Sequence, residues 1–367
     1  MKESLGIYIH IPFCVRKCRY CDFLSGLATK EVQKSYVEKL LEEIDGYKEL
    51  LRDRKTDTIF FGGGTPSVID AQDIARILGK IMAYGNVSKN AEISIEANPG
   101  TVTVQKLKFW KAAGINRISF GLQSADNEEL KCLGRIHTWE EFVENYQMAR
   151  QCGFENINVD LMSALPGQTV ESWRTTMERV AALKPEHISA YSLIIEEGTP
   201  FFDAYEDHPE LLPKEEDERQ MYYDTKAFLA SKGYERYEIS NYAKPGFECR
   251  HNLSYWNRVD YLGLGLGAAS LLGNVRKSNQ TDLKEYLLGN FAGEEELLSE
   301  INAMEEYFFL GLRKTRGVDW TIYRETYEKI VERLIKEGLL EKEGNFVRLT
   351  ELGIDVSNQV LAEFLVE

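Results

Sequence analysis

A strand-like apolar run leads directly into three cysteines within eight positions in the stretch Ile7-Tyr-Ile-His-Ile-Pro-Phe-Cys14-Val-Arg-Lys-Cys18-Arg-Tyr-Cys21. Three residues separate the first two cysteines and two separate the last two, so all three sulfurs are brought into one small volume. Three thiolates on an iron–sulfur cube leave one iron without a protein ligand. That iron has free coordination sites at which a small molecule can bind and react. The stretch therefore predicts an iron–sulfur site held by Cys14, Cys18 and Cys21.

Two other roles for the three cysteines compete with an iron–sulfur site. Buried structural cysteines are disfavoured, because Arg16 and Lys17 stand between them. Zinc is the stronger rival, because His10 precedes Cys14 by four residues and would complete a Cys3His site. His10 lies in an alternating strand pattern, however, so we expect its side chain to point into the fold.

The composition describes a globular protein of two or three domains: 367 residues, 43% of them hydrophobic and 28% charged. No apolar run approaches eighteen residues and no signal peptide is recognised, so we expect a cytoplasmic protein with reduced thiols. Cys132, Cys152 and Cys249 are scattered, which argues against a disulfide framework. The net charge of −15 argues against nucleic acid as a partner.

Short β-rich runs alternate with amphipathic helical stretches through the first half of the chain. Six such units predict a parallel sheet in a partial (β/α)6 TIM-like barrel, with the C-terminal strand ends on one face. After a long helix at 213–232, an aromatic segment follows, and helices with a hairpin at 339–349 predict a small winged-helix-like α+β domain in a packing or lid role. The predicted strands are 7–11, 58–61, 92–96, 117–122, 158–161 and 187–193, and the helices between them 30–52, 71–83, 103–113, 139–151 and 170–183.

Polar and glycine motifs follow the predicted strand ends. Gly62-Gly63-Gly64-Thr65-Pro66 closes the second strand, where consecutive glycines let a backbone approach a ligand closely. Glu96, Gln123 and Asp160 end the next three strands, and Arg135 follows the fourth. These side chains offer acceptors for an ammonium or for ribose hydroxyls, and a donor for a carboxylate. We expect them to line one pocket beside the cysteines.

Together these motifs resemble those of the radical S-adenosylmethionine superfamily, and within it the coproporphyrinogen III oxidase-like family, over nearly the whole chain. The resemblance implies that Cys14, Cys18 and Cys21 hold a [4Fe-4S] cluster whose fourth iron is chelated by S-adenosylmethionine. Homolysis of a sulfonium C–S bond would then give a 5′-deoxyadenosyl radical. The resemblance assigns these residues to the S-adenosylmethionine site: Tyr8, Tyr20, Gly63, Gly64, Thr65, Glu96, Gln123, Arg135 and Asp160.

Three features separate the two branches of that family, the coproporphyrinogen dehydrogenases (HemN) and the haem chaperones (HemW). The dehydrogenases carry a fourth cysteine where this chain has Phe23, and a sizeable N-terminal extension, whereas Cys14 here is near the start. His251-Asn-Leu-Ser-Tyr-Trp256 is similar to the H-N-x-x-Y-W signature of the chaperones. By this resemblance His251 is an axial or attachment residue for haem, with Tyr255 and Trp256 offering flat apolar area for a porphyrin face. The alternative is a core histidine satisfied by a hydrogen bond.

We therefore expect a haem chaperone with a cluster-bearing core at 1–232, an aromatic connecting segment at 233–281 and a C-terminal domain at 282–367. Its expected partners are haem or a porphyrin, a haem-acceptor protein and an electron donor, with a homodimer and transient membrane association left open. The alternative is oxidative decarboxylation of coproporphyrinogen III, and a tRNA-modifying radical enzyme is disfavoured by the acidic charge. We expect surface or capping positions for His137, His187 and His208.

Overall fold

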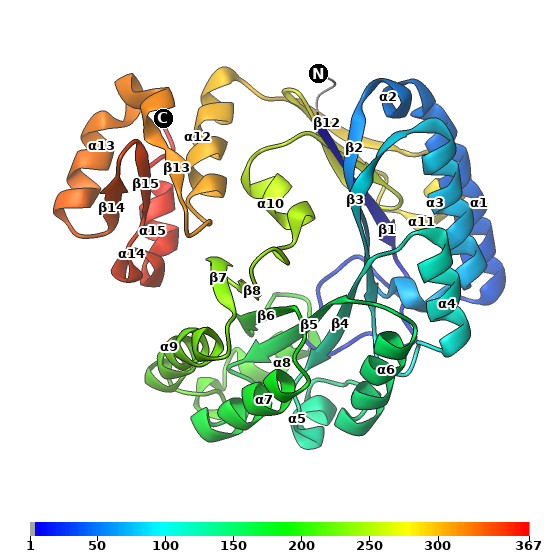
Figure 1. The fold of residues 1–367 in the computed structure, drawn as a ribbon, viewed down its shortest axis with the longest axis horizontal. Helices are drawn as coiled ribbons and strands as arrows, with labels where there is room; N and C mark the ends of the chain where they lie inside the picture. The colour runs from blue at the N-terminus through cyan, green and yellow to red at the C-terminus, as the bar shows by residue number, and fades with distance from the viewer. Residues whose placement is uncertain (1–3, 367) are drawn as a thin grey trace.

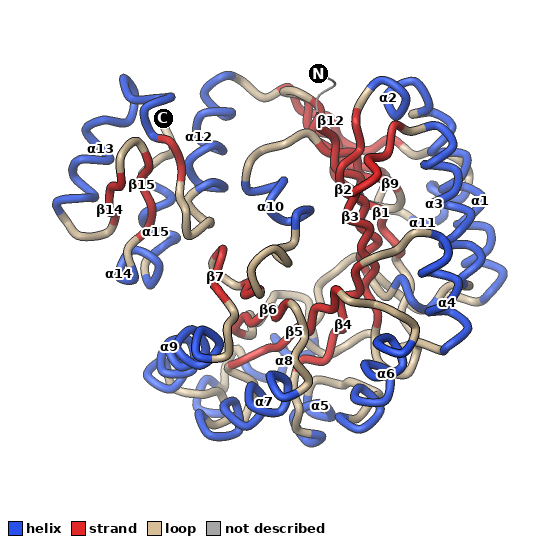
Figure 2. The backbone as a smooth tube through the Cα atoms, in the orientation of Figure 1, coloured by secondary structure: helices blue, strands red, loops and turns tan. Residues whose placement is uncertain are grey.

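A computed structural model describes residues 4–366 of the chain. A single sheet of twelve strands curves through most of the molecule, and its central six strands pair in parallel in the order of the sequence (Figures 1 and 2). This confirms the predicted α/β class with six β/α units. The six strands are β1 (Ser4–Ile11), β2 (Lys55–Gly63), β3 (Asn86–Ala97), β4 (Arg117–Gln123), β5 (Asn156–Ser163) and β6 (His187–Ser192).

Six shorter strands extend both edges of this parallel sheet. On one side β8 pairs antiparallel with β6 and then with β7; on the other, β9 pairs parallel with β1 and leads to β10, β11 and β12. The segment 233–281, expected as a connector, thus supplies five strands to the same sheet. The edge strands are β7 (Glu235–Glu238), β8 (Asn241–Ala243), β9 (Tyr261–Leu264), β10 (Ala269–Leu272), β11 (Val275–Asn279) and β12 (Ala292–Leu297).

Helices cover the convex face of the sheet, whereas the short helix α10 (Arg250–Trp256) lies within its concave side (Figure 1). The predicted helix at 30–52 is two helices, because Tyr47 leaves the helical conformation with φ −104° and ψ 11°. Within residues 4–366 no helix is long and apolar enough to cross a membrane. The other helices of this part are α1 (Lys30–Gly46), α2 (Lys48–Asp53), α3 (Ala71–Tyr84), α4 (Val104–Ala113), α5 (Asn127–Cys132), α6 (Trp139–Gln151), α7 (Val170–Ala182), α8 (Pro200–Tyr205), α9 (Glu215–Ser231) and α11 (Leu283–Leu287).

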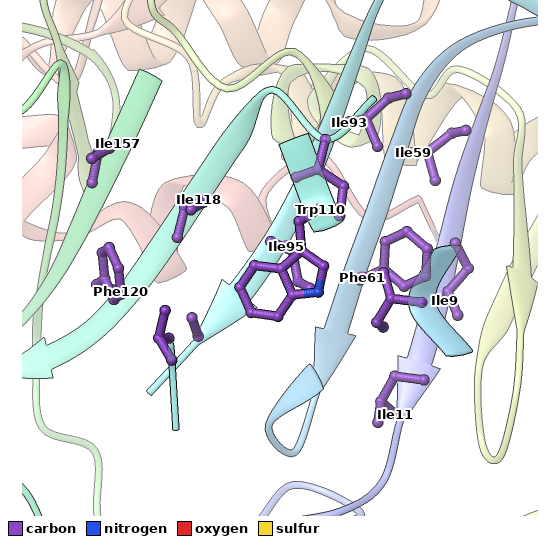
Figure 3. Packing of buried hydrophobic residues seen from close by; sticks show 14 of the residues in the cluster. Ile9, Ile11, Ile59, Phe61, Ile93, Ile95, Trp110, Ile118, Phe120 and Ile157 are labelled. Atoms are coloured by element: carbon purple, nitrogen blue, oxygen red, sulfur yellow. The ribbon is translucent and has the colours of Figure 1, made fainter. Parts of the chain in front are cut away.

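The alternation of side chains along each strand separates the core from the concave face. Ile9 and Ile11 of β1 are fully buried toward the helices, as are Ile59 and Phe61 of β2, and Trp110 of α4 lies with them (Figure 3). Since successive side chains of a strand point to opposite faces, the residues between these apolar positions line the inside of the curve. That inner lining is where the polar residues of the sheet gather.

The C-terminal part has a hydrophobic core of its own, built on Phe308, Tyr327, Val347 and Phe364. The predicted hairpin is present, with a turn at Gly344, whose φ is +60°. A third short strand joins it to give a three-stranded antiparallel sheet beside helices, the small α+β domain that was predicted. Its elements are α12 (Glu300–Gly311), β13 (Val318–Asp319), α13 (Arg324–Lys336), β14 (Leu340–Glu343), β15 (Phe346–Leu349), α14 (Glu351–Asp355) and α15 (Ser357–Ala362).

Candidate functional site

The three cysteines of the opening motif lie on the loop that follows β1 and line one cavity of about 470 Å³. Cys14 is fixed through its backbone N–H, which donates to Gly26 O at 2.9 Å. Its sulfur lies 3.5 Å from Thr65 Oγ1, and Cys18 Sγ accepts a hydrogen bond from Arg135 Nη1 at 3.4 Å. A hydroxyl and a guanidinium thus stand beside two of the sulfurs and hold them toward the cavity that a metal cluster would occupy.

His10 points into the fold, as predicted, and is engaged away from the cysteines. Its Nε2 lies 2.9 Å from Leu24 O and its Nδ1 lies 3.1 Å from the Tyr8 hydroxyl. Within residues 4–366 no three His, Cys, Asp or Glu side chains converge on a position for a single metal ion. The engagement of His10 elsewhere argues against the Cys3His zinc site, and the three thiols remain for a [4Fe-4S] cluster, in which each would bind a separate iron.

The glycine loop after β2 is shaped so that its backbone stands close to the cysteine loop. Gly63 has φ +113°, and a Cβ added there would come within 2.6 Å of the His10 ring. A Cβ on Gly64 would come within 2.9 Å of Phe13 O, in the loop that carries the cysteines. Any larger residue at either position would push these segments apart, so both glycines are needed where a ligand is to be held against backbone.

Glu96 and Asp160, from the C-terminal parts of β3 and β5, project into the same cavity. Burial raises the pKa of Glu96 to about 8, with the nearby charge of Asp160 adding to the effect; the N–H of Gly63, 3.2 Å from Glu96 Oε2, works against it. Burial also raises the pKa of Asp160, although Ser119 and Asn158 donate hydrogen bonds to it at 3.1 and 2.7 Å. Two acids in a low-dielectric cavity are suited to a ligand with an ammonium group and hydroxyls.

Gln123 and Arg135 complete the wall beside the cysteines. Gln123 has φ +76°, a conformation that is uncommon outside glycine, and its Oε1 accepts a hydrogen bond from the Tyr191 hydroxyl at 3.0 Å. Arg135 donates to Asn98 Oδ1 at 2.7 Å as well as to Cys18. The strained backbone at Gln123 and the two hydrogen bonds that hold the Arg135 guanidinium are typical of a preorganised binding site.

The structure brings together nearly all of the residues that the sequence assigned to the cluster and to S-adenosylmethionine. The large cavity is lined by Cys14, Cys18, Tyr20, Cys21, Gly63, Gly64, Thr65, Glu96, Gln123, Arg135 and Asp160. Tyr8 and His251 line an adjoining chamber of about 200 Å³. The two spaces share five lining residues, so the chamber is a continuation of the cavity.

His251 is 1% exposed, and both of its ring nitrogens are engaged. Nδ1 lies 2.8 Å from Thr58 Oγ1 and Nε2 lies 3.0 Å from the Tyr255 hydroxyl, and the ring stacks on Phe60 with 5.2 Å between centroids. Burial and the charge of Arg117 lower the pKa of the imidazole to about 3, so the ring is neutral. Its role as a haem ligand stays a prediction, and it requires one of these hydrogen bonds to open.

Several inner-face residues were not predicted as part of the site. His187, expected at the surface or in a cap, is fully buried, with Nδ1 2.6 Å from Asn158 Oδ1 and Nε2 2.8 Å from the Tyr237 hydroxyl. The same expectation was wrong for His137, which is 4% exposed, whereas His208 is exposed. The signal that could have found the missed residues is their period of two. On β4, β5 and β6 they share a face with the predicted acids: Arg117, Ser119, Asn158, His187, Ser189 and Tyr191.

Comparison with known protein families gives two matches. Residues 8–180 match the family described as the radical SAM superfamily, and residues 298–356 match the HemN C-terminal domain. Both matches fall where the structure has the parallel sheet and the C-terminal domain.

Several named relatives align with this chain from end to end. Proteins named heme chaperone HemW are 37% identical in Lactococcus lactis, over 100% of this chain and 99% of that protein, and 35% identical in Bacillus subtilis, over 98% and 99%. The corresponding protein of Escherichia coli is 34% identical over 99% and 98%. Among solved structures, the coproporphyrinogen III oxidase HemN of Escherichia coli, described as a radical SAM enzyme, has a TM-score of 0.85 and 25% identity, covering 100% of this chain and 91% of that one.

Proposed function

Because this chain belongs to the radical SAM superfamily and, within it, to the family of the HemW haem chaperones, we propose that it binds haem and delivers it to an acceptor protein. The observation that carries the proposal is the sequence similarity, 34 to 37% identity along the whole chain, with proteins named as heme chaperones in several bacteria. Phe23, at the position of the dehydrogenases' fourth cysteine, supports the same choice.

The cofactors expected of this family fit the residues present. Cys14, Cys18 and Cys21 would hold the [4Fe-4S] cluster, and the Gly63–Thr65 loop with the cavity acids would hold S-adenosylmethionine. When both are bound they supply reductive cleavage of the sulfonium. The chain's own contribution is to fix the sulfurs through Thr65 and Arg135 and to keep the acids in a cavity of low dielectric constant.

We further propose His251 as the haem ligand, reached when α10 releases it. Freeing Nε2 requires the loss of the Tyr255 hydrogen bond, so Tyr255→Phe should strengthen haem binding while His251→Ala should weaken it. Titration of haem into the parent and both variants, followed in the Soret region, tests this directly. Identical spectra for the parent and His251→Ala would contradict the assignment.

The second candidate function is oxidative decarboxylation of coproporphyrinogen III, favoured by the fold shared with HemN. Incubating the cluster-loaded protein anaerobically with coproporphyrinogen III and S-adenosylmethionine separates the two proposals. We expect haem binding without turnover, and sustained formation of protoporphyrinogen would overturn the chaperone proposal. An electron donor, a homodimer and transient membrane association belong to the chaperone proposal as partners and states to be tested by co-purification and sedimentation.

A further inference from the structure

Arg117 is a buried cation that makes no direct ion pair with any residue in 4–366. It stands at the start of β4, on the concave face, with 2% of its surface exposed. Among residues 4–366 the side chain of Arg117 forms no hydrogen bond and no ion pair, and its Nε is completely buried without a partner. Burying an unpaired guanidinium is costly, and buried charges in proteins are nearly always paired. An anion bound beside the guanidinium would supply the partner that residues 4–366 do not.

The chamber beside Arg117 is built for a small polar group. It has a volume of about 200 Å³, and it opens toward the cofactor cavity past Glu96, Ser119 and Asp160, which line both spaces. Hydroxyl and amide groups complete its wall; they come from Tyr8, Ser119, Asn158, Ser189, Asn252 and Tyr255. Such a space has room for a carboxylate-bearing side chain and not for a whole porphyrin.

The acids near Arg117 leave this place open to an anion. Glu92 is committed to the backbone of α10, accepting from the N–H groups of Arg250 at 3.0 Å and His251 at 3.1 Å. Asp160 is occupied by Ser119 and Asn158. Burial raises the pKa of Glu96 and of Asp160, which weakens the repulsion that these acids would exert on an anion bound at Arg117.

We propose that this chamber is a binding site for a ligand carboxylate, held by the fork of Arg117. Arginine matches a carboxylate with two parallel hydrogen bonds, which is the geometry that a planar anion in a narrow chamber requires. Resting on the proposed function, the carboxylate is a propionate of haem. The other source of the same chemistry is a small free carboxylate.

The first arm of the test compares haem with haem dimethyl ester, which lacks both carboxylates, on the cluster-loaded protein. The parent should bind haem at least tenfold more tightly than the ester, and Arg117→Gln should bind both with the weaker affinity. Arg117→Lys keeps the charge and loses the forked guanidinium, so its preference for haem over the ester should lie between those of the parent and of Arg117→Gln. Equal affinity of the parent for haem and ester, or full discrimination in Arg117→Gln, would overturn the haem source.

The second arm is independent of haem binding and uses sodium propionate as the probe in thermal melts. Propionate should stabilise the parent and not Arg117→Gln. If it does so while the parent binds haem and its dimethyl ester equally, the site belongs to a small carboxylate. No stabilisation and no discrimination together would overturn the proposal. A parent that binds neither haem nor ester but responds to propionate would instead count against the chaperone function.

A folding control follows from the same geometry. Because the Arg117 side chain has no hydrogen-bond or ion-pair partner among residues 4–366, Arg117→Gln should be at least as stable as the parent without ligand. Arg258→Gln, which removes a partly buried arginine paired with buried Glu306 at 2.7 Å, should be less stable. Loss of stability in Arg117→Gln equal to that in Arg258→Gln would show that Arg117 is a structural cation and would overturn the proposal.

Discussion

Replacing Glu96 with glutamine should stabilise the ligand-free protein, and increasingly so as the pH rises. The glutamate has a pKa of about 8 in the folded chain, against 4.5 for an ordinary glutamate, because burial and the charge of Asp160 disfavour its ionised form. Below pH 4.5 both states hold the proton. Between about 4.5 and 8 the unfolded chain releases it and the folded chain retains it, so the free energy of unfolding falls as pH rises through this window and levels off above it.

The size of the effect follows from the shift. About 3.5 pKa units at 1.36 kcal/mol each set an upper limit near 5 kcal/mol. Glu96 borders a cavity that water can enter, and hydration weakens the penalty for its charge, so we expect roughly 2 kcal/mol. Glutamine preserves an acceptor for the N–H of Gly63 and has no charge to bury.

The measurement is a set of urea titrations at pH 5, 7 and 9 on the parent and Glu96→Gln, at constant ionic strength. The advantage of the variant should be small at pH 5 and largest at pH 9. Glu306→Gln serves as a control of opposite sign, because it breaks ion pairs with Arg258 and Arg276 and should be less stable than the parent at each pH. An advantage that stays constant or shrinks toward pH 9 would refute the reasoning.

Two further predictions concern the cofactors. Gly63→Ala places a Cβ within 2.6 Å of the His10 ring at φ +113°, so the affinity for S-adenosylmethionine, measured by calorimetry, should fall at least tenfold. Gly79 is a helical glycine with open space around it, so the control Gly79→Ala should leave the affinity unchanged. Equal losses in both variants would contradict the argument. Arg135→Leu removes a charged hydrogen bond to Cys18 Sγ, so the cluster's reduction potential should fall by about 60 mV, the equivalent of 1.4 kcal/mol for one electron. Redox titration followed by electron paramagnetic resonance measures it, and an unchanged or higher potential would count against that role.

The central sheet was predictable because its strands are buried on one face and end in conspicuous polar motifs. The strand predicted at 117–122 is found as Arg117–Gln123, and that at 158–161 lies within Asn156–Ser163. Since parallel strands place their C-terminal ends on one edge, the sequence alone assigns Glu96 and Asp160 to one pocket. Local alternation and topology together were sufficient here.

The strands of the sheet edges were not predictable in the same way. β7 to β11 are three to five residues long, which is too short for a period of two to stand out from the surrounding aromatic sequence. Their pairing is also non-local: β9 lies against β1, more than two hundred residues earlier. His187 illustrates a related gap, because its burial depends on the hydrogen bonds to Asn158 and Tyr237, from two other strands.

The histidine motif of α10 and Arg117 are best understood as two parts of one chamber. His251 and Tyr255 are four residues apart, so they share a face of the helix, and that face closes the chamber opposite the strands. The hydrogen bond between them therefore holds the chamber at its present size. If haem binds through His251, Tyr255 must turn away, which enlarges the space beside Arg117 at the same moment that a propionate would need it. A double variant combining Tyr255→Phe with Arg117→Gln should then lose the gain in haem affinity that Tyr255→Phe gives alone, whereas independent sites would keep that gain.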